Sequence, residues 1–158
     1  MEVMRMEKTV EDILEKLNDA RRVVVARESA AHGENYVDAY GNLQIAAVFD
    51  HYFVVEIDNK TIIEKKIEDE EDEEECEAIS DLIHEAIVER IVERVAEIVN
   101  DAQDVEWLGG CDYGCCLFFE TNNKKYRVKF ADFNDINTTH YKANTVIYTL
   151  DNISITEE

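Results

Sequence analysis

Residues 77–101 read EAISDLIHEAIVERIVERVAEIVND, and two side-chain patterns run through this stretch with the same period. Apolar residues recur at every fourth position from Ile79 to Val99, and carboxylates recur at every fourth position from Glu77 to Asp101. This spacing, uninterrupted by proline or glycine, predicts a helix over residues 77–101. Because a helix advances about 100° per residue, each step of four turns both patterns by about 40° around the axis. The apolar band therefore winds, and we expect the helix to cross a twisted sheet at one end and to meet another surface at the other.

A run of acidic residues precedes this helix. Residues 68–77 read EDEEDEEECE and hold nine carboxylates in ten positions. From Glu68 to Glu106, seventeen acidic residues stand against two arginines, a net charge of −15 out of the chain's −21. We expect the run to link the preceding strands to the helix. The acids are interpreted either as a surface for a basic partner or as the solvated side of an amphipathic helix.

The sequence on both sides of the helix predicts short elements, mostly strands. The N-terminal segment has apolar residues at helical spacing, whereas the remaining segments are rich in β-branched and aromatic residues and are separated by short turns. We predict a short helix at 6–19, a loop at 28–42, and strands at 21–26, 43–49, 52–57, 61–67, 116–120, 125–130, 145–150 and 153–155.

These elements define the expected fold class. They predict an α+β fold with antiparallel sheets, a short N-terminal helix and one long acidic central helix. The 158 residues suit a single domain. The alternative is two small lobes, 1–67 and 102–158, joined by the acidic run and helix at 68–101.

Charge and hydropathy limit the location and the partners. No stretch approaches the roughly 20 apolar residues of a membrane span, and the N-terminus lacks a secretory apolar core. We therefore expect a cytoplasmic protein, in the host cell's cytoplasm if it is viral, with its four cysteines reduced. A net charge of −21 argues against direct binding to nucleic acid or to an anionic membrane.

One set of residues could support catalysis. Asp58-Asn59-Lys60 fits half of the Asp/Glu-x-Lys pattern of restriction-type nucleases, as does Glu64-Lys65-Lys66, and Asp50 is the candidate for the second carboxylate. Asp50 lies eight residues from Asp58 across a predicted strand, about 26 Å at 3.3 Å per residue. We therefore expect no enzymatic activity, and keep a metal-dependent nuclease of viral or mobile-element origin as an alternative.

No pattern predicts a cofactor or a metal site. Cys111, Cys115 and Cys116 lie close together, but their spacing is not that of a standard zinc site, and a tight glycine turn with buried thiols explains them better. The acidic run lacks the spaced ligands of a calcium loop. Lys125, Arg127 and Lys129 share one face of a predicted strand, where we expect solvent or acidic neighbours.

The charge layout resembles that of small acidic inhibitors that phages and mobile elements use against host nucleases, namely DNA-mimic anti-restriction proteins and anti-CRISPR proteins. The resemblance lies in charge layout alone. It implies an acidic inhibitor that occupies the nucleic-acid-binding or catalytic surface of a basic partner such as a nuclease. The helix offers one carboxylate per roughly 6 Å, sparser than the one charge per about 1.7 Å of duplex DNA. An acidic adaptor or assembly module is the third interpretation.

The expected partner surface combines the acidic run and the helix. Its residues are Glu70, Glu71, Asp72, Glu73, Glu74, Glu77, Asp81, Glu85, Glu89, Glu93, Glu97 and Asp101. We also expect a homodimer through the winding apolar band, because one sheet face covers about half of it.

Overall fold

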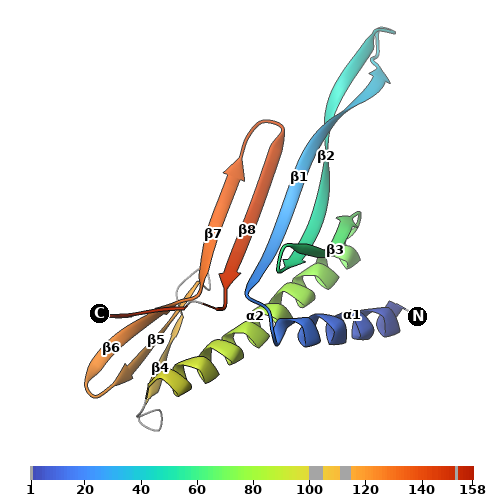
Figure 1. Ribbon diagram of the computed structural model, residues 1–158. Helices are drawn as coiled ribbons and strands as arrows, with labels where there is room; N and C mark the ends of the chain where they lie inside the picture. The colour runs from blue at the N-terminus through green and yellow to red at the C-terminus, as the bar shows by residue number, and fades with distance from the viewer. Residues whose placement is uncertain (1, 100–104, 111–114, 152) are drawn as a thin grey trace.

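The computed structural model describes residues 2–99, 105–110, 115–151 and 153–158 (Figure 1). The described elements confirm the predicted α+β fold, with a short N-terminal helix, a long central helix and two antiparallel sheets. In chain order they are α1 (Glu2–Leu17), β1 (Arg22–Val37), β2 (Leu43–Ile57), β3 (Lys60–Ile67), α2 (Glu70–Ile98), β4 (Glu106–Gly110), β5 (Cys116–Thr121), β6 (Lys124–Lys129), β7 (Ala131–Asn137), β8 (Tyr141–Thr149) and β9 (Ser154–Glu157).

Most of the acidic run belongs to α2, so its prediction as a link was wrong. Asp69 is the N-cap, and its side chain accepts a hydrogen bond from Asp72 N at 2.9 Å. Asp72 in turn accepts one from Glu68 N at 3.0 Å. Four acids, Glu70 to Glu73, occupy the first turn, where the positive end of the helix dipole favours negative charge. The capping bonds and the helix dipole therefore stabilise these acidic residues as the first turn of α2, although their like charges repel one another.

The first sheet has the order β3-β2-β1-β8-β7, with long central strands. The predicted loop at 28–42 was wrong for residues 28–37, which continue β1. The predicted break at Asp50 and His51 was also wrong, because both residues pair across to β1 within one strand, β2. Gly33 does not break β1, since it lies beneath Ile45, whose Cγ2 would be 3.0 Å from an added Cβ. The chain turns instead at Asp38, whose carboxylate accepts hydrogen bonds from Tyr40 N and Asn42 N.

The second sheet has the order β4-β5-β6-β9. The predicted hairpin between β5 and β6 is confirmed, with Asn122 and Asn123 at positive φ in its turn. β4 and β7 were missed. Although β8 and β9 are separated by four residues, β8 joins the first sheet and β9 joins the second. The amides of Phe130 and Ala131 both donate to Cys115 O where β6 gives way to β7, so the two sheets meet at this point.

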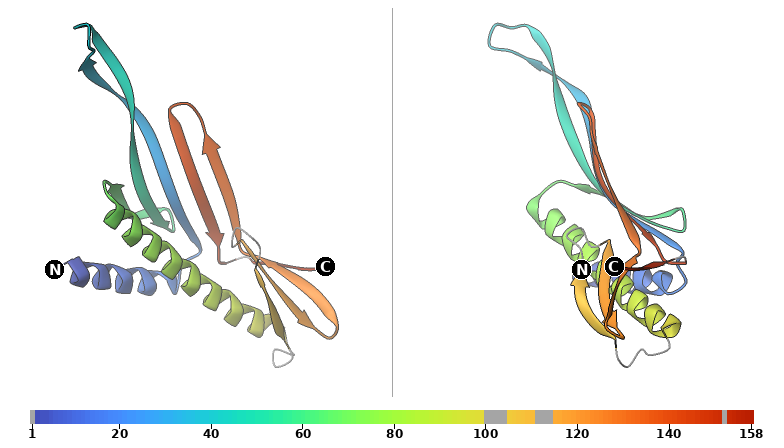
Figure 2. Two further views of the ribbon diagram at one scale, coloured as in Figure 1. Left: turned by 180° about the vertical axis from the view of Figure 1, so that it is seen from behind. Right: turned by 90° about the vertical axis from the view of Figure 1, so that its left-hand side faces the viewer.

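One hydrophobic core joins both helices and both sheets. Figure 2 shows α2 running beneath the first sheet and on to the second. The buried residues of α2 are Cys76, Ile79, Ile83, Ile87, Ile91 and Val95. The second surface that the winding band was expected to meet is therefore the chain's own second sheet. Ile79 to Val95 are buried within one chain, whereas Val88, Val92 and Val99 are half-buried, so the dimer through this band stays a prediction.

Candidate functional site

The exposed side of α2 carries the carboxylate ladder, defined as Glu77, Asp81, Glu85, Glu89, Glu93 and Glu97. All six are exposed. Each stands two residues from a buried position, about 200° away around the helix. Because both patterns advance by four residues, the ladder winds together with the core and remains on the opposite side of α2 throughout. The ladder spans about 30 Å at 1.5 Å per residue.

The acids at the start of α2 have a different environment. Lys65 on β3 lies 3.3 Å from Asp72 and 2.7 Å from Glu75, and these carboxylates raise its pKa. Glu73 forms an ion pair with Arg27 on β1. Of the predicted partner-binding residues, Asp72 and Glu73 thus fasten α2 to the first sheet. Glu70, Glu71 and Glu74 are exposed beside them, while Asp101 lies outside the described residues.

The two arginines of α2 play unequal roles. Arg94 forms an exposed ion pair with Glu97 at 2.9 Å, as the i,i+3 spacing suggests. Arg90 extends away from the ladder toward the end of α1, where it donates hydrogen bonds to Leu17 O at 2.8 Å and Ala20 O at 2.6 Å. Over the described residues, no basic side chain forms an ion pair with the ladder members from Glu77 to Glu93. Five consecutive carboxylates are therefore available to a partner.

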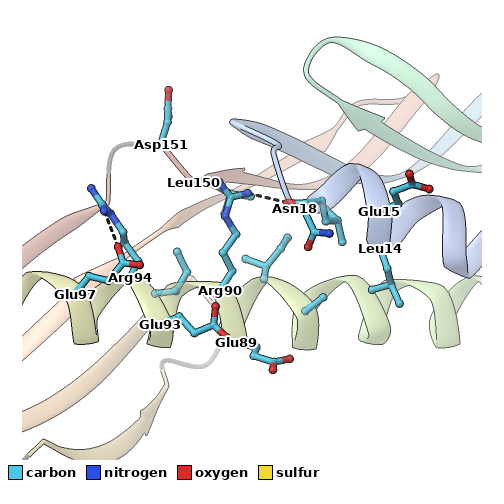
Figure 3. Close-up of a pocket in the computed structure, with 14 residues that line it drawn as sticks. Leu14, Glu15, Asn18, Glu89, Arg90, Glu93, Arg94, Glu97, Leu150 and Asp151 are labelled. Atoms are coloured by element: carbon cyan, nitrogen blue, oxygen red, sulfur yellow. Dashed lines mark hydrogen bonds and ion pairs between the residues drawn. The ribbon is translucent and has the colours of Figure 1, made fainter. Parts of the chain in front are cut away.

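A groove that the sequence did not predict lies beside the ladder. It is bounded by α1, the second half of α2 and the segment after β8, with a volume of about 700 Å³. Figure 3 shows Arg90 crossing it toward α1, with Glu89 and Glu93 on the α2 side. Glu15 and Asp151 line it from the other elements. Residues so far apart in sequence are brought together only by the packing of α1 on α2, so no local pattern could have revealed the groove.

The candidate nuclease residues have structural roles and stand apart. Asp58 occupies the β2–β3 turn at φ 50° and accepts hydrogen bonds from Arg21 N at 2.8 Å and Arg22 N at 3.0 Å. These bonds lower its pKa. Asp50 lies eight residues back along β2, where it contacts His32 at 2.7 Å and Lys66 at 3.4 Å. The structure does not bring these two carboxylates together at one metal position.

The cysteines that the sequence suggested for a metal site do not form one among the described residues. Cys116 is buried and Cys115 partly buried, while Cys111 lies outside the described residues. Within the described part of the chain, no three His, Cys, Asp or Glu side chains are placed to hold a metal ion.

The basic residues of β6 are exposed as predicted, and Lys129 lies 2.9 Å from Asp132. Of the described helices, none has the length and apolar character to cross a membrane.

Two further cavities contain titratable groups. One, at the N-terminal end of α2, places Ser29 Oγ 2.6 Å from His51 Nδ1, an exposed cross-strand pair on β1 and β2. The other is an apolar hollow between α2 and the second sheet, with His84 on its wall. His84 Nδ1 lies 3.0 Å from the Tyr148 hydroxyl, and burial lowers the histidine's pKa. Both arrangements follow from strand register or core packing.

Comparison with family models, with curated proteins and with solved structures found no match for this chain.

Proposed function

We propose that this chain is an acidic binding protein that occupies the nucleic-acid-binding surface of a basic partner and thereby inhibits it. The observation that carries the proposal is the first five members of the carboxylate ladder, Glu77 to Glu93, which are exposed on one helix and form no ion pair with a basic side chain among the described residues. Such a surface attracts positively charged groups at long range and speeds their association.

The winding of the ladder defines which acids can act together. From Glu77 to Glu97 the ladder turns by about 200°, so a flat partner surface cannot face all six residues. Glu85, Glu89 and Glu93 span only about 80° and lie at the centre. Glu89 and Glu93 also line the groove between α1 and α2, which gives a partner's basic side chain a recess with carboxylates on more than one side. We assign the partner contact to this central part.

The test is a charge reversal with a matched control. The variant Glu85→Lys/Glu89→Lys/Glu93→Lys and the control Glu64→Lys/Glu106→Lys/Glu158→Lys change the net charge equally, and all six positions are exposed. Each protein is immobilised and used to capture partners from the source cell. Captured proteins are identified, then purified for kinetics at several salt concentrations and for competition with an oligonucleotide.

The expected result is a basic protein that the unmodified chain and the control retain equally. The ladder variant should associate with it roughly 10- to 100-fold more slowly, within the range by which electrostatic steering accelerates encounter. Added salt should weaken binding, and the oligonucleotide should compete. Full binding by the ladder variant would refute the assignment. A partner insensitive to the ladder, to salt and to the oligonucleotide would favour an adaptor.

A further inference from the structure

The outer part of the β1–β2 hairpin extends beyond the rest of the first sheet. β8 pairs with β1 as far as Ala30, with one further bond from Ala31 N to His140 O, and β3 pairs with β2 only from His51 onward. The remaining residues, 31–37 and 43–50, form a two-stranded ribbon, which Figures 1 and 2 show projecting away from both helices. Such an isolated ribbon is marginally stable in water by itself.

One face of this ribbon continues the apolar face of the core. Side chains alternate along a strand, so the face that carries Val25 and Phe53 over α2 also carries the odd-numbered residues of the ribbon. α2 begins near the Arg27–Glu73 ion pair and covers only the lower part of this face. On the ribbon, Val37, Leu43 and Ile45 are 66%, 71% and 73% exposed.

The side chains of this ribbon face are uncharged, although Lys142 of β8 lies over the Phe49 ring at its base, 5.6 Å from the ring centroid. Its described side chains are Ala31, Asn35, Val37, Leu43, Ile45 and Phe49, together with Gly33. Within the ribbon, the charged and titratable residues His32, Glu34, Tyr36 and Asp50 belong to the opposite face. Two copies of a chain with net charge −21 repel each other over most of their surface. At physiological salt, exposed charges are screened beyond about 8 Å, so the repulsion is weak where a face carries no acidic side chains.

We propose that this apolar face binds the same face of a second copy, with the two ribbons stacked antiparallel so that the acidic helices lie at opposite ends of the dimer. A basic protein finds no opposite charge on this surface, whereas a second copy offers an apolar face of equal size. Tyr40, 90% exposed at the hairpin end, extends the contact. The exposed apolar side chains of the face are few, so the area that they bury should fall below the roughly 1,200–2,000 Å² of stable complexes. The dimer should therefore be weak and in equilibrium with the monomer.

The experiment is sedimentation velocity on the purified full chain from 10 to 500 µM, with a variant and a control on opposite faces of the same strands. The variant is Leu43→Thr/Ile45→Thr. The control, Tyr36→Thr/Gln44→Thr, replaces two directly opposed residues on the other face. Threonine suits strands in both, and because the ribbon lies outside the core, both should fold.

The unmodified chain and the control should shift with concentration from 18.3 kDa toward twice that mass, and the Leu43/Ile45 variant should remain at 18.3 kDa. Raising the salt should leave the dimer intact or favour it, opposite to its effect on partner binding by the ladder. A monomer at all concentrations, an unaffected variant, or a dimer that dissociates at higher salt would each overturn the proposal. Slower amide exchange at residues 31–37 and 43–49 at the higher concentration gives a second, independent readout.

Discussion

Arg90 offers a sharp test of how α1 is held, because Arg94 lies one turn further along the same helix and provides a matched control. Arg90→Met removes the guanidinium that bonds Leu17 O and Ala20 O at the end of α1. Leu17 O keeps a bond from Ala20 N at 3.3 Å, so Ala20 O loses most. Arg94→Met removes an exposed pair with Glu97. Both variants change the net charge equally.

The expected magnitudes differ severalfold. A hydrogen bond from a charged group contributes about 1.5–3 kcal/mol, and a cation at a helix C-terminus adds roughly 0.3–1 kcal/mol. Arg90→Met should therefore lower the free energy of unfolding by about 2–4 kcal/mol. An exposed ion pair contributes about 0.2–1 kcal/mol, which bounds the loss in Arg94→Met.

Urea unfolding measures both losses. For a chain of this size, each kcal/mol lost from the free energy of unfolding lowers the melting temperature by about 2–4 °C. Arg90→Met should therefore melt about 4–16 °C below the unmodified chain. The urea midpoint should fall with little change in its slope, because the surface exposed on unfolding is the same. If the two variants lose the same free energy of unfolding within about 0.5 kcal/mol, the bonds from Arg90 to the end of α1 do not stabilise the fold beyond an exposed ion pair.

Three further outcomes follow from individual contacts. Asp58→Ala should destabilise by about 1–2 kcal/mol through its two lost backbone bonds, and Asp58→Asn by less, because asparagine suits positive φ and still accepts a hydrogen bond. The pKa of Asp58 is lower in the folded chain than the value of about 3.9 in the unfolded chain, so its charged form stabilises the fold above that pH. The difference in unfolding free energy between the unmodified chain and Asp58→Asn should therefore disappear as the pH falls through the folded pKa. Unfolding measured over a series of acidic pH values would show this. Burial raises the pKa of Tyr148 to about 12, so ultraviolet titration of Tyr148→Phe should lack the highest-pH tyrosine step, and the stability linked to this group should be lost as pH rises from about 10. Burial also raises the pKa of the fully buried Cys76 thiol, so a thiol reagent should label Cys76 only when the protein unfolds, as peptide mapping would show.

The elements predicted correctly are those that the spacing of residues within a short stretch of sequence determines. The four-residue spacing of Ile79 to Val95 gave the helix and its buried side, and Asn122-Asn123 gave the β5–β6 turn. Alternation along β6 separated exposed Lys125 and Arg127 from buried Val128. Each of these depends on neighbours a few residues apart.

The errors came from context that local patterns do not contain. Gly33 looks like a chain breaker, but β2 supplies Ile45 to cover it, so the strand continues. The run at 70–76 looks like a linker whose like charges repel one another, but Lys65 on the preceding strand and Arg27, 46 residues from Glu73, form ion pairs with three of its acids. The same tertiary contacts divide the predicted partner surface into a part that fastens the helix and a part that faces solvent.

This division bears on the purpose of the ladder. Like charges at i,i+4 cost about 0.2–0.5 kcal/mol each, so the five successive pairs from Glu77 to Glu97 cost on the order of 1–2.5 kcal/mol. A helix face that needs only solubility can alternate acidic and basic residues at this spacing and gain similar amounts instead. The start of α2 shows that this chain does pair acids with bases where they support folding, through Lys65 and Arg27. From Glu77 to Glu93 the ladder forgoes such pairing over about 24 Å, and this cost supports our proposal that it meets opposite charge on another molecule.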